Sequence, residues 1–470
     1  MSGEIVFTAK GGGNEIGASH GHYLFDDELV AVDCGLRPLN FNSDIRLYHT
    51  HNRELQVFLD EMLVKPEVNP LPNLDTGGYE LKHLLVTHAH LDHSAAIPYL
   101  LRQHRYTNIY MTPVTAKLSK IQWFSTPRIA ERRGEVPLFN ESDAEFALSR
   151  IVEIHPGRRI RINSGLEVEP VHAGHLLGAV SFIFYLNGGP VGFHTGDLTL
   201  RNNQRSVPDA PRVEFDRLLF LTIDSTRLTE QNPPRHIEEE RFKETVHKAY
   251  GEGMKIRILT FAFGRIQEMF ALVKEACPDA DIWLDGQGRD VSAIYAEHLG
   301  GEFSGIEKHF VRDKTQRLGI LRSKKPNIVL APSAMQFGGT SRRYIEYGCG
   351  QSDHLFISPG YRDPRSPEYA FFASTSHNDV FEFGAYRSAR MCETATFNFT
   401  AHCDGDDVLD TVDRANPEKV LLVHGDKDKM EKFAENHRNT ETTEATEERK
   451  NPIHRNQRFV VTENNRPISV

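Results

Sequence analysis

Apolar runs broken by glycine, proline and polar turns divide the chain into short segments. The stretches "EIVFTA" (4–9), "HYLFDDELVAVDCG" (22–35) and "LLV" (84–86) predict strands, and "SAAIPYLLRQHR" (94–105) predicts a helix that carries an early proline. Strand follows strand from 151 to 223, and helical and strand patterns then alternate from about 229 to 393. This alternation predicts a layered α/β architecture.

Length and composition bound the class of protein. A chain of 470 residues is too long for one ordinary core, so we expect two domains. The hydrophobic share is 39% and the charged share 26%, the balance of a globular protein. No apolar run approaches the ~18 residues that span a bilayer, and the start lacks a signal-peptide pattern, so we expect a cytoplasmic protein without a membrane partner.

The net charge and the cysteines narrow the possible sites. A net charge of -10 repels a polyanion, so any nucleic-acid site must be a local basic surface or a metal centre. The five cysteines are scattered and never spaced as C-x-x-C, which favours buried thiols over a disulfide framework or a thiolate zinc site.

The strongest chemical signal is "HAHLDH", which directly follows the strand at 84–86. His88 and His90 lie two residues apart, a spacing that aims both side chains to one side of an extended segment. Asp92 and His93 follow on the turn, where they can face a second ion. Four ligand-type residues in six positions favour a metal site over isolated structural histidines.

Two further segments extend this set. "VHAGHLLGA" supplies His172 and His175, and "FHTGDLTL" supplies Asp197 on the turn after a strand. Together these residues resemble the H-x-H-x-D-H signature, the later histidine and the bridging aspartate of the metallo-β-lactamase superfamily. The sequence G-H-x-x-G-A, whose histidine is His175, matches the third motif of that family, so we favour His175 as the ligand, with His172 as the alternative.

The resemblance implies a four-layer αβ/βα sandwich with the metals at one edge, between the two sheets. Asp33, which ends its strand beside Gly35, matches the first motif of the superfamily and would orient the site from behind the ligands.

Three later motifs resemble the β-CASP branch of nucleases, which includes ribonuclease J and the endonuclease of the cleavage and polyadenylation specificity factor. "LTIDST" carries Asp224, "FTAHCD" carries His402 and "LLVHGD" carries His424. "FAFGRIQEM" and "APSAMQFGGTSRR" resemble two loops of the same branch, although "PSAM" departs from the more usual "SPGM". In this branch a histidine at the position of His424 goes with RNA and a valine with DNA.

Read by role, the resemblance implies two zinc ions, with Mn2+ as an alternative. It implies that Asp197 bridges the two ions and that His402 is the general acid, oriented by Asp224. Asp92 joins His402 and Asp224 in the catalytic set. One ion would have the ligands His88, His90 and His175, and the other would have Asp92, His93 and His424.

Phosphate contacts are expected at two places. A glycine-led helix begins near Gly264 with Arg265 beside it, and its backbone N–H groups can face a phosphate. The loop that carries Ser333, Ser341 and Arg342 has the small and basic residues that such contacts need. An ordinary strand-to-helix turn and a solvated loop are the alternatives.

The sequence therefore predicts an α/β metallo-β-lactamase domain from 1–228 and 394–470, with a β-CASP domain inserted at 229–393. We expect neither an RNA-binding module before the first strand nor a long domain after the last. The expected function is zinc-dependent hydrolysis of RNA, as an endonuclease, a 5′→3′ exonuclease or both. RNA is the expected binding partner, and the protein could form a homodimer. The alternatives are a DNA nuclease of the same branch, a catalytically silent scaffold subunit, and a small-molecule hydrolase.

Overall fold

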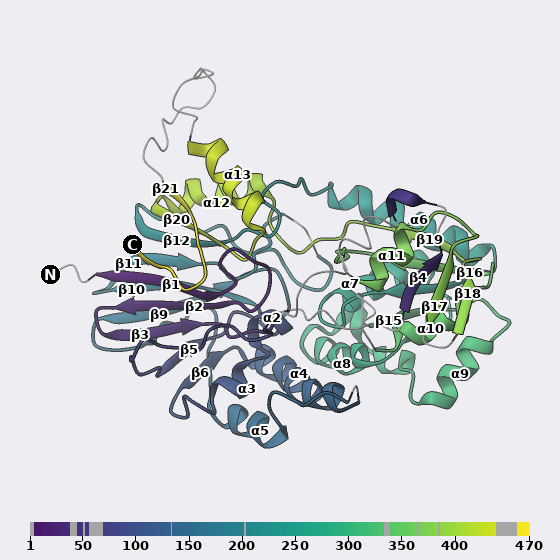
Figure 1. Ribbon diagram of the computed structural model, residues 1–470, viewed down its shortest axis with the longest axis horizontal. Helices are drawn as coiled ribbons and strands as arrows, with labels where there is room; N and C mark the ends of the chain where they lie inside the picture. Colours follow the sequence, from purple (N-terminus) through teal and green to yellow (C-terminus); the bar gives the residue numbers. More distant parts are fainter. Residues whose placement is uncertain are drawn as a thin grey trace, which may run out of the picture.

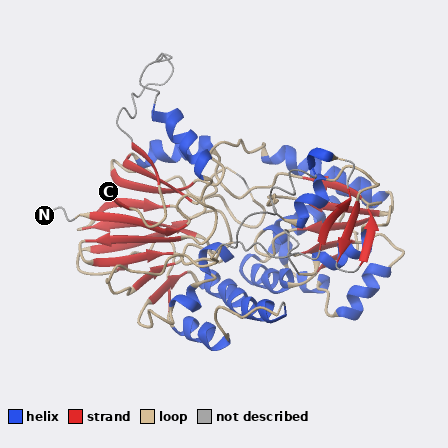
Figure 2. Cartoon of the chain, viewed as in Figure 1, coloured by secondary structure: helices blue, strands red, loops and turns tan. Residues whose placement is uncertain are grey.

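Two stacked sheets form one end of the molecule, as the computed structural model shows in Figures 1 and 2. The structure describes residues 4–37, 45–49, 52–55, 69–132, 134–201, 204–332, 339–364, 366–383, 386–438 and 458–470. In spatial order the first sheet contains β22 (Pro467–Ser469), β1 (Ile5–Gly11), β2 (His20–Phe25), β3 (Glu28–Val32), β5 (His83–Leu85), β6 (Asn108–Met111) and β7 (Ile151–Glu153). The second contains β21 (Arg458–Val461), β20 (Pro417–Val423), β12 (Leu218–Asp224), β11 (Gly189–His194), β10 (Val180–Leu186), β9 (Leu166–His172) and β8 (Ile160–Arg161).

The facing sides of these sheets share one core. Tyr23 of the first sheet packs against Phe184 and Phe220 of the second, with ring centroids 4.9 Å and 5.3 Å away. Helices cover the outer faces, as Figure 1 shows. Those of the first sheet are α2 (Leu91–Ser94), α3 (Ile97–Leu100), α4 (Pro113–Arg132) and α5 (Glu141–Ser149), and those of the second are α12 (Gly405–Ala415) and α13 (Lys427–Arg438). The predicted four-layer sandwich is confirmed.

A third, all-parallel sheet forms a separate unit at the other end of the molecule (Figure 2). Its strands, in spatial order, are β14 (Ile282–Leu284), β15 (Ile328–Ala331), β13 (Lys255–Leu259), β16 (His354–Ser358) and β19 (Glu393–Thr396). The three central strands, β15, β13 and β16, are buried along their whole length, as expected for a parallel sheet that is covered on both faces. The helical elements of this unit are α6 (Arg235–Gly251), α7 (Arg265–Ala276), α8 (Gln287–Leu299), η1 (Gly301–Phe303), η2 (Ile306–His309), α9 (Lys314–Arg322), α10 (Ser341–Gly348) and α11 (Pro367–Ala373).

A small three-stranded sheet lies beside this unit and links distant parts of the sequence. It contains β18 (Tyr386–Ala389), β17 (Val380–Phe383) and β4 (Ile45–His49). An early segment of the chain thus pairs with strands more than 300 residues later. The domain boundaries remain predictions. Strand β19 of the third sheet crosses the boundary predicted between residues 393 and 394.

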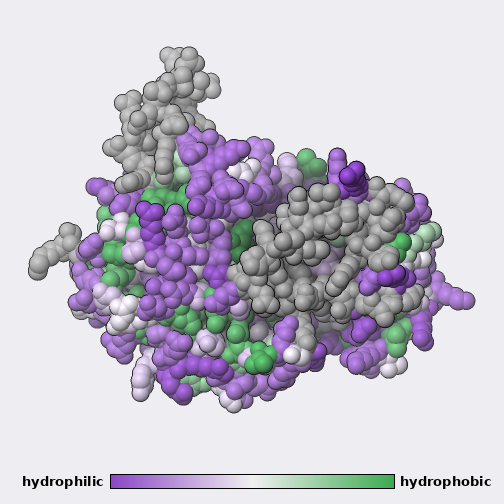
Figure 3. Space-filling view, in the orientation of Figure 1, coloured by the Kyte–Doolittle hydropathy of each residue, from purple (hydrophilic) through white to green (hydrophobic). Residues whose placement is uncertain are grey.

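The surface in Figure 3 is mostly hydrophilic on the face shown. None of the described helices has the length and apolar character needed to cross a bilayer.

Candidate metal centre

The loop after β5 carries the "HAHLDH" residues and is fixed by the segment that follows β3. Main-chain N–H groups of Cys34 and Leu36 donate to the carbonyls of His93 and Leu91, at 2.8 Å and 3.0 Å. A Cβ on Gly35 would lie 1.8 Å from the carbonyl oxygen of Asp92. Gly35 is therefore required for the close approach of the two segments, a role beyond the simple turn that the sequence suggests.

Three histidines converge in the first group of ligands. The Nδ1 atom of His90 lies 3.1 Å from Nε2 of His88 and 3.0 Å from Nε2 of His175. Tetrahedral Zn–N bonds of ~2.05 Å place two ligand nitrogens about 3.3 Å apart, so this spacing fits zinc. Burial lowers the pKa of His88 and His90 and lowers the pKa of His175 to about 3. Neutral imidazoles with converging nitrogens are suited to bind a cation.

Hydrogen bonds select the tautomers of these histidines. His175 Nδ1 donates to the carbonyl of Ala401 at 2.6 Å, which leaves its Nε2 lone pair facing the cluster. The hydroxyl of Thr87 donates to Asp33 at 2.7 Å, so the 3.0 Å contact between Thr87 Oγ1 and His88 Nδ1 needs the proton on His88. The Nε2 atom of His88 is thereby left as a ligand atom.

A second group contains Asp92, His93 and His424. His424 Nε2 lies 3.1 Å from Asp92 Oδ2, and His93 Nδ1 donates to Asp33 Oδ2 at 2.8 Å. Burial lowers the pKa of His93 and His424, but the carboxylates around them outweigh it; the pKa of His424 rises to about 10 and that of His93 well above its usual value. Cation binding at this group therefore displaces protons.

Asp197 lies between the two groups and is 3% exposed. Its Oδ2 is 3.5 Å from His88 Nε2 and 3.4 Å from His175 Nε2, and its Oδ1 is 3.3 Å from His93 Nε2. Oδ1 has no hydrogen-bond partner although it is buried. Burial raises the pKa of Asp197, but the surrounding histidines, His93 first, hold it well below its usual value. An ionised buried carboxylate with one unpartnered oxygen fits a bridging metal ligand.

His402 and Asp224 form a pair beside this cluster. His402 Nδ1 lies 2.8 Å from Asp224 Oδ2, and the His402 side chain is 21% exposed whereas that of Asp224 is fully buried. Burial lowers the pKa of His402, but Asp224 and Asp197 outweigh it and raise the pKa above its usual value. The imidazolium can therefore present its Nε2–H toward solvent while Nδ1 stays bound to Asp224.

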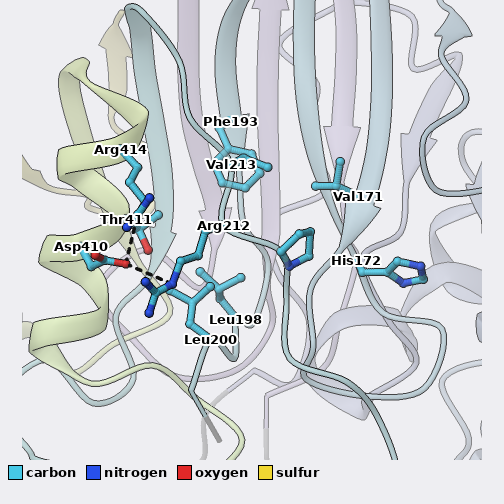
Figure 4. A pocket seen from close by; sticks show the side chains of 11 residues that line it. Val171, His172, Phe193, Leu198, Leu200, Arg212, Val213, Asp410, Thr411 and Arg414 are labelled. Carbon is cyan, nitrogen blue, oxygen red and sulfur yellow. Dashed lines mark hydrogen bonds and ion pairs between the residues drawn. The ribbon is translucent and has the colours of Figure 1, made fainter. Parts of the chain in front are cut away.

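His172, the alternative to His175, is exposed at the end of β9. Figure 4 shows it at a hollow on the outer side of the second sheet, next to α12. Asp410 on that helix pairs with Arg212 at 3.7 Å and, one turn along the same helix, with Arg414 at 3.3 Å. The structure brings His175 to the metal cluster and leaves His172 away from it.

The first phosphate candidate lies at the start of α7. Gly264 has φ +79°, and a Cβ there would lie 2.9 Å from Leu176 Cδ1, so this turn packs beside the histidine loop. Arg265 has a buried Nη1 atom without a hydrogen-bond partner, and burial lowers its pKa to about 10. The turn that leads to Arg265 therefore lies beside the histidine loop, whereas the unpartnered Nη1 atom itself is buried.

The second phosphate candidate receives less support. Ser333 lies outside the described residues. Ser341 is fully buried and its hydroxyl has no partner, whereas the Arg342 guanidinium donates to Glu346 at 2.8 Å. Neither side chain is presented to solvent as a free phosphate contact.

Several residues that complete the site carried no signal in the sequence. Thr87 and Thr226 connect the ligands to the two buried aspartates; the Thr226 hydroxyl donates to Asp224 at 2.6 Å and lies 3.0 Å from His424 Nδ1. A cavity of about 30 Å³ behind the ligands is lined by His20, among others. Single histidines within a strand pattern are not distinguishable from structural ones.

Two family models match the segments that carry this geometry. Residues 50–235 match the metallo-beta-lactamase superfamily, and residues 389–452 match the Zn-dependent metallo-hydrolase RNA specificity domain. The chain belongs to the metallo-β-lactamase superfamily. The two matched ranges contain every candidate metal ligand as well as His402 and Asp224.

Similar proteins extend the match over most of the chain. The transcription termination factor FttA of Pyrococcus abyssi is 27% identical over 90% of this chain and 67% of its own length. The cleavage and polyadenylation specificity factor subunit 3-I of Arabidopsis thaliana is 24% identical over 91% and 60%, so this chain spans less than two thirds of that relative. The probable RNase MJ4 of Methanocaldococcus jannaschii is 23% identical over 90% and 93%.

A solved structure also shares the fold. A protein of unknown function from Enterococcus faecalis V583 aligns over 99% of this chain and all of its own, with a TM-score of 0.58 and 15% identity. The predicted enzyme class is confirmed: this superfamily member is a zinc-dependent metallo-hydrolase with an RNA specificity domain, within the β-CASP family of RNA-processing nucleases.

Proposed function

We propose that this protein is a ribonuclease that hydrolyses RNA phosphodiester bonds, as an endonuclease, a 5′→3′ exonuclease or both. The observation that carries the proposal is the arrangement around Asp197, with a group of ligands on each side and the His402–Asp224 pair beside them. A metal centre with an adjacent proton donor is what in-line displacement at phosphorus requires.

The metal roles form part of the proposal. We assign two zinc ions, with Mn2+ as the alternative, and Asp197 would be a ligand in both sites. When bound, such ions lower the pKa of a shared water and neutralise charge on the phosphate oxygens. His88, His90 and His175 would hold one ion, and Asp92, His93 and His424 would hold the other.

The side chains of this protein perform the proton transfers and the positioning. His402 donates its Nε2 proton to the leaving oxygen, and Asp224 holds the ring orientation and stabilises the protonated form. Asp92 acts in the catalytic set as well as in the ligand set. Arg265 offers its unpartnered N–H to a neighbouring phosphate, and Gly264 lets the start of α7 approach the histidine loop.

The two units meet close to the ligands, which supports an RNA path between them. Ala89 and Leu176, which neighbour the histidine ligands, pack in one buried cluster with Val291 and Tyr295 of α8. The ring of Phe263 lies 6.4 Å from that of His90. We therefore place the RNA path along this junction.

RNA is favoured over DNA by the RNA specificity match and by His424 at the third β-CASP motif. A silent scaffold is disfavoured because the chain has a metal-binding side chain at every expected ligand position. A homodimer, a cytoplasmic location and an RNA contact from Ser333 remain predictions.

The test uses RNAs labelled at the 5′ end, one with a monophosphate and one with a triphosphate, and the matching DNA. Mononucleotide from the monophosphate RNA identifies a 5′ exonuclease, and internal fragments from both RNAs identify an endonuclease. Cleavage of DNA alone, or of none of the three by zinc-loaded protein, contradicts the proposal.

A further inference from the structure

Strand β2 brings two buried histidines behind the metal centre. His20 and His22 are 2% and 4% exposed, and they lie on one side of the strand because they are two residues apart. Their Nε2 atoms are 2.9 Å apart, and His20 Nδ1 lies 2.6 Å from the carbonyl oxygen of Asp33. Among the described residues, neither belongs to a group that can hold a metal ion.

The hydrogen bonds define the tautomer of each ring. A carbonyl oxygen only accepts, so Nδ1 of His20 carries a proton and donates to Asp33. In the neutral ring, Nε2 of His20 then has a lone pair, and Nε2–H of His22 donates to it. Burial lowers the pKa of His20 to about 4 and that of His22 well below its usual value, and Lys10 acts in the same direction.

The receiving residue, Asp33, adopts an unusual backbone conformation. Its φ is +58°, in the left-handed region that side chains other than glycine rarely occupy. Its N–H donates to the carbonyl of Leu85 at 2.8 Å, and its carboxylate accepts from Thr87 N and from His93 Nδ1, both at 2.8 Å. The carbonyl bond to His20 is therefore one of the bonds that hold this conformation.

The orientation of Asp33 matters because it sets the tautomer of His93. With Nδ1–H donated to Asp33, His93 turns Nε2 toward the second ligand group, 3.3 Å from Asp197 Oδ1, and this nitrogen becomes a ligand atom when a cation displaces its proton. Partners behind a ligand histidine typically affect metal affinity through this orientation.

We propose that His20 and His22 are positioning residues whose hydrogen-bonded pair holds Asp33 in its left-handed conformation and so keeps His93 ready for metal binding. The inference rests on the metal centre of the proposed function and adds a layer behind it. Simple space filling between the sheets is the alternative. His194 offers the matched case, because it is also buried but bonds Tyr23 at 2.8 Å instead of Asp33.

The test measures zinc affinity by competition with a chromophoric chelator, without RNA. His20→Leu removes the donor to Asp33, and we expect roughly 10- to 100-fold weaker binding of one zinc equivalent. His20→Asn, whose amide nitrogen stands close to the place of Nδ1, should restore most of the affinity. The control His194→Leu should bind zinc like the wild type.

Wild-type affinity in folded His20→Leu overturns the inference, and so do equal losses in His20→Leu, His20→Asn and His194→Leu, because equal losses indicate packing. If His20→Leu does not fold, His22→Leu is measured instead, because it removes the donor to Nε2 of His20. Weaker zinc binding by His22→Leu supports the inference, and unchanged binding overturns it. A wild-type protein that binds zinc but leaves RNA intact contradicts the proposed function and leaves this inference standing.

Discussion

The substitution Gly35→Ala tests how tightly the ligand loop is positioned. The added Cβ would lie 1.8 Å from the carbonyl oxygen of Asp92 and 2.4 Å from the amide nitrogen of His93. An ordinary C···O contact is about 3.3 Å, so the loop must move by about 1.5 Å. A misplacement of ~1 Å can cost about 100-fold in rate, so we expect RNA cleavage to fall at least that far. Gly35 is not in the left-handed region, so the loss arises from this contact.

The assay compares initial rates of RNA cleavage, zinc content and circular dichroism for the variant and a control. Gly319→Ala is the matched control, because Gly319 lies in α9 with no atom within 4 Å of an added Cβ. Alanine within a helix should stabilise the control by roughly 0.5–1 kcal/mol and leave cleavage unchanged. Wild-type cleavage and zinc content in Gly35→Ala would refute the reasoning.

Three further outcomes follow from the site and its surroundings. The Asp224 carboxylate raises the pKa of His402, so Asp224→Asn should move the alkaline fall in cleavage rate to lower pH. An unshifted pH profile would contradict His402 as the general acid. Glu268→Gln removes one of the two carboxylates that pair with buried Arg235 and should cost about 3 kcal/mol in denaturant unfolding. The exposed-pair control Arg205→Ala, whose side chain is 39% exposed, should cost under about 1 kcal/mol. Chelation should lower the melting temperature and zinc should restore it, because zinc at about 100 times its Kd contributes about 2.7 kcal/mol; an unchanged melting temperature speaks against a bound ion.

Local motifs explain why much of the site was predictable. His88, His90, Asp92 and His93 follow one strand within six residues, so their spacing alone indicates ligands. His424 and the other distant ligands could be placed only by resemblance, because no local pattern states which strand ends meet. The layered α/β class was predictable from the alternation of strands and helices, whereas the four-layer sandwich was expected only from the resemblance.

Long-range contacts account for most of what the sequence could not predict. The contact between Gly35 and Asp92 depends on two segments that pack only in the folded chain. The pairing of β4 with β17 joins segments that are distant in sequence. His20 and His22 look like ordinary strand residues until the Asp33 carbonyl is placed beside them.

The most direct test of the account is RNA cleavage by protein that is first stripped of metal and then reloaded with zinc. Wild type, Asp92→Ala and His402→Ala are compared on one 5′-labelled RNA, with circular dichroism to verify folding. The account predicts cleavage that zinc restores in the wild type and that is abolished in both folded variants. Full activity in either variant, or wild-type cleavage that persists without metal, would contradict it.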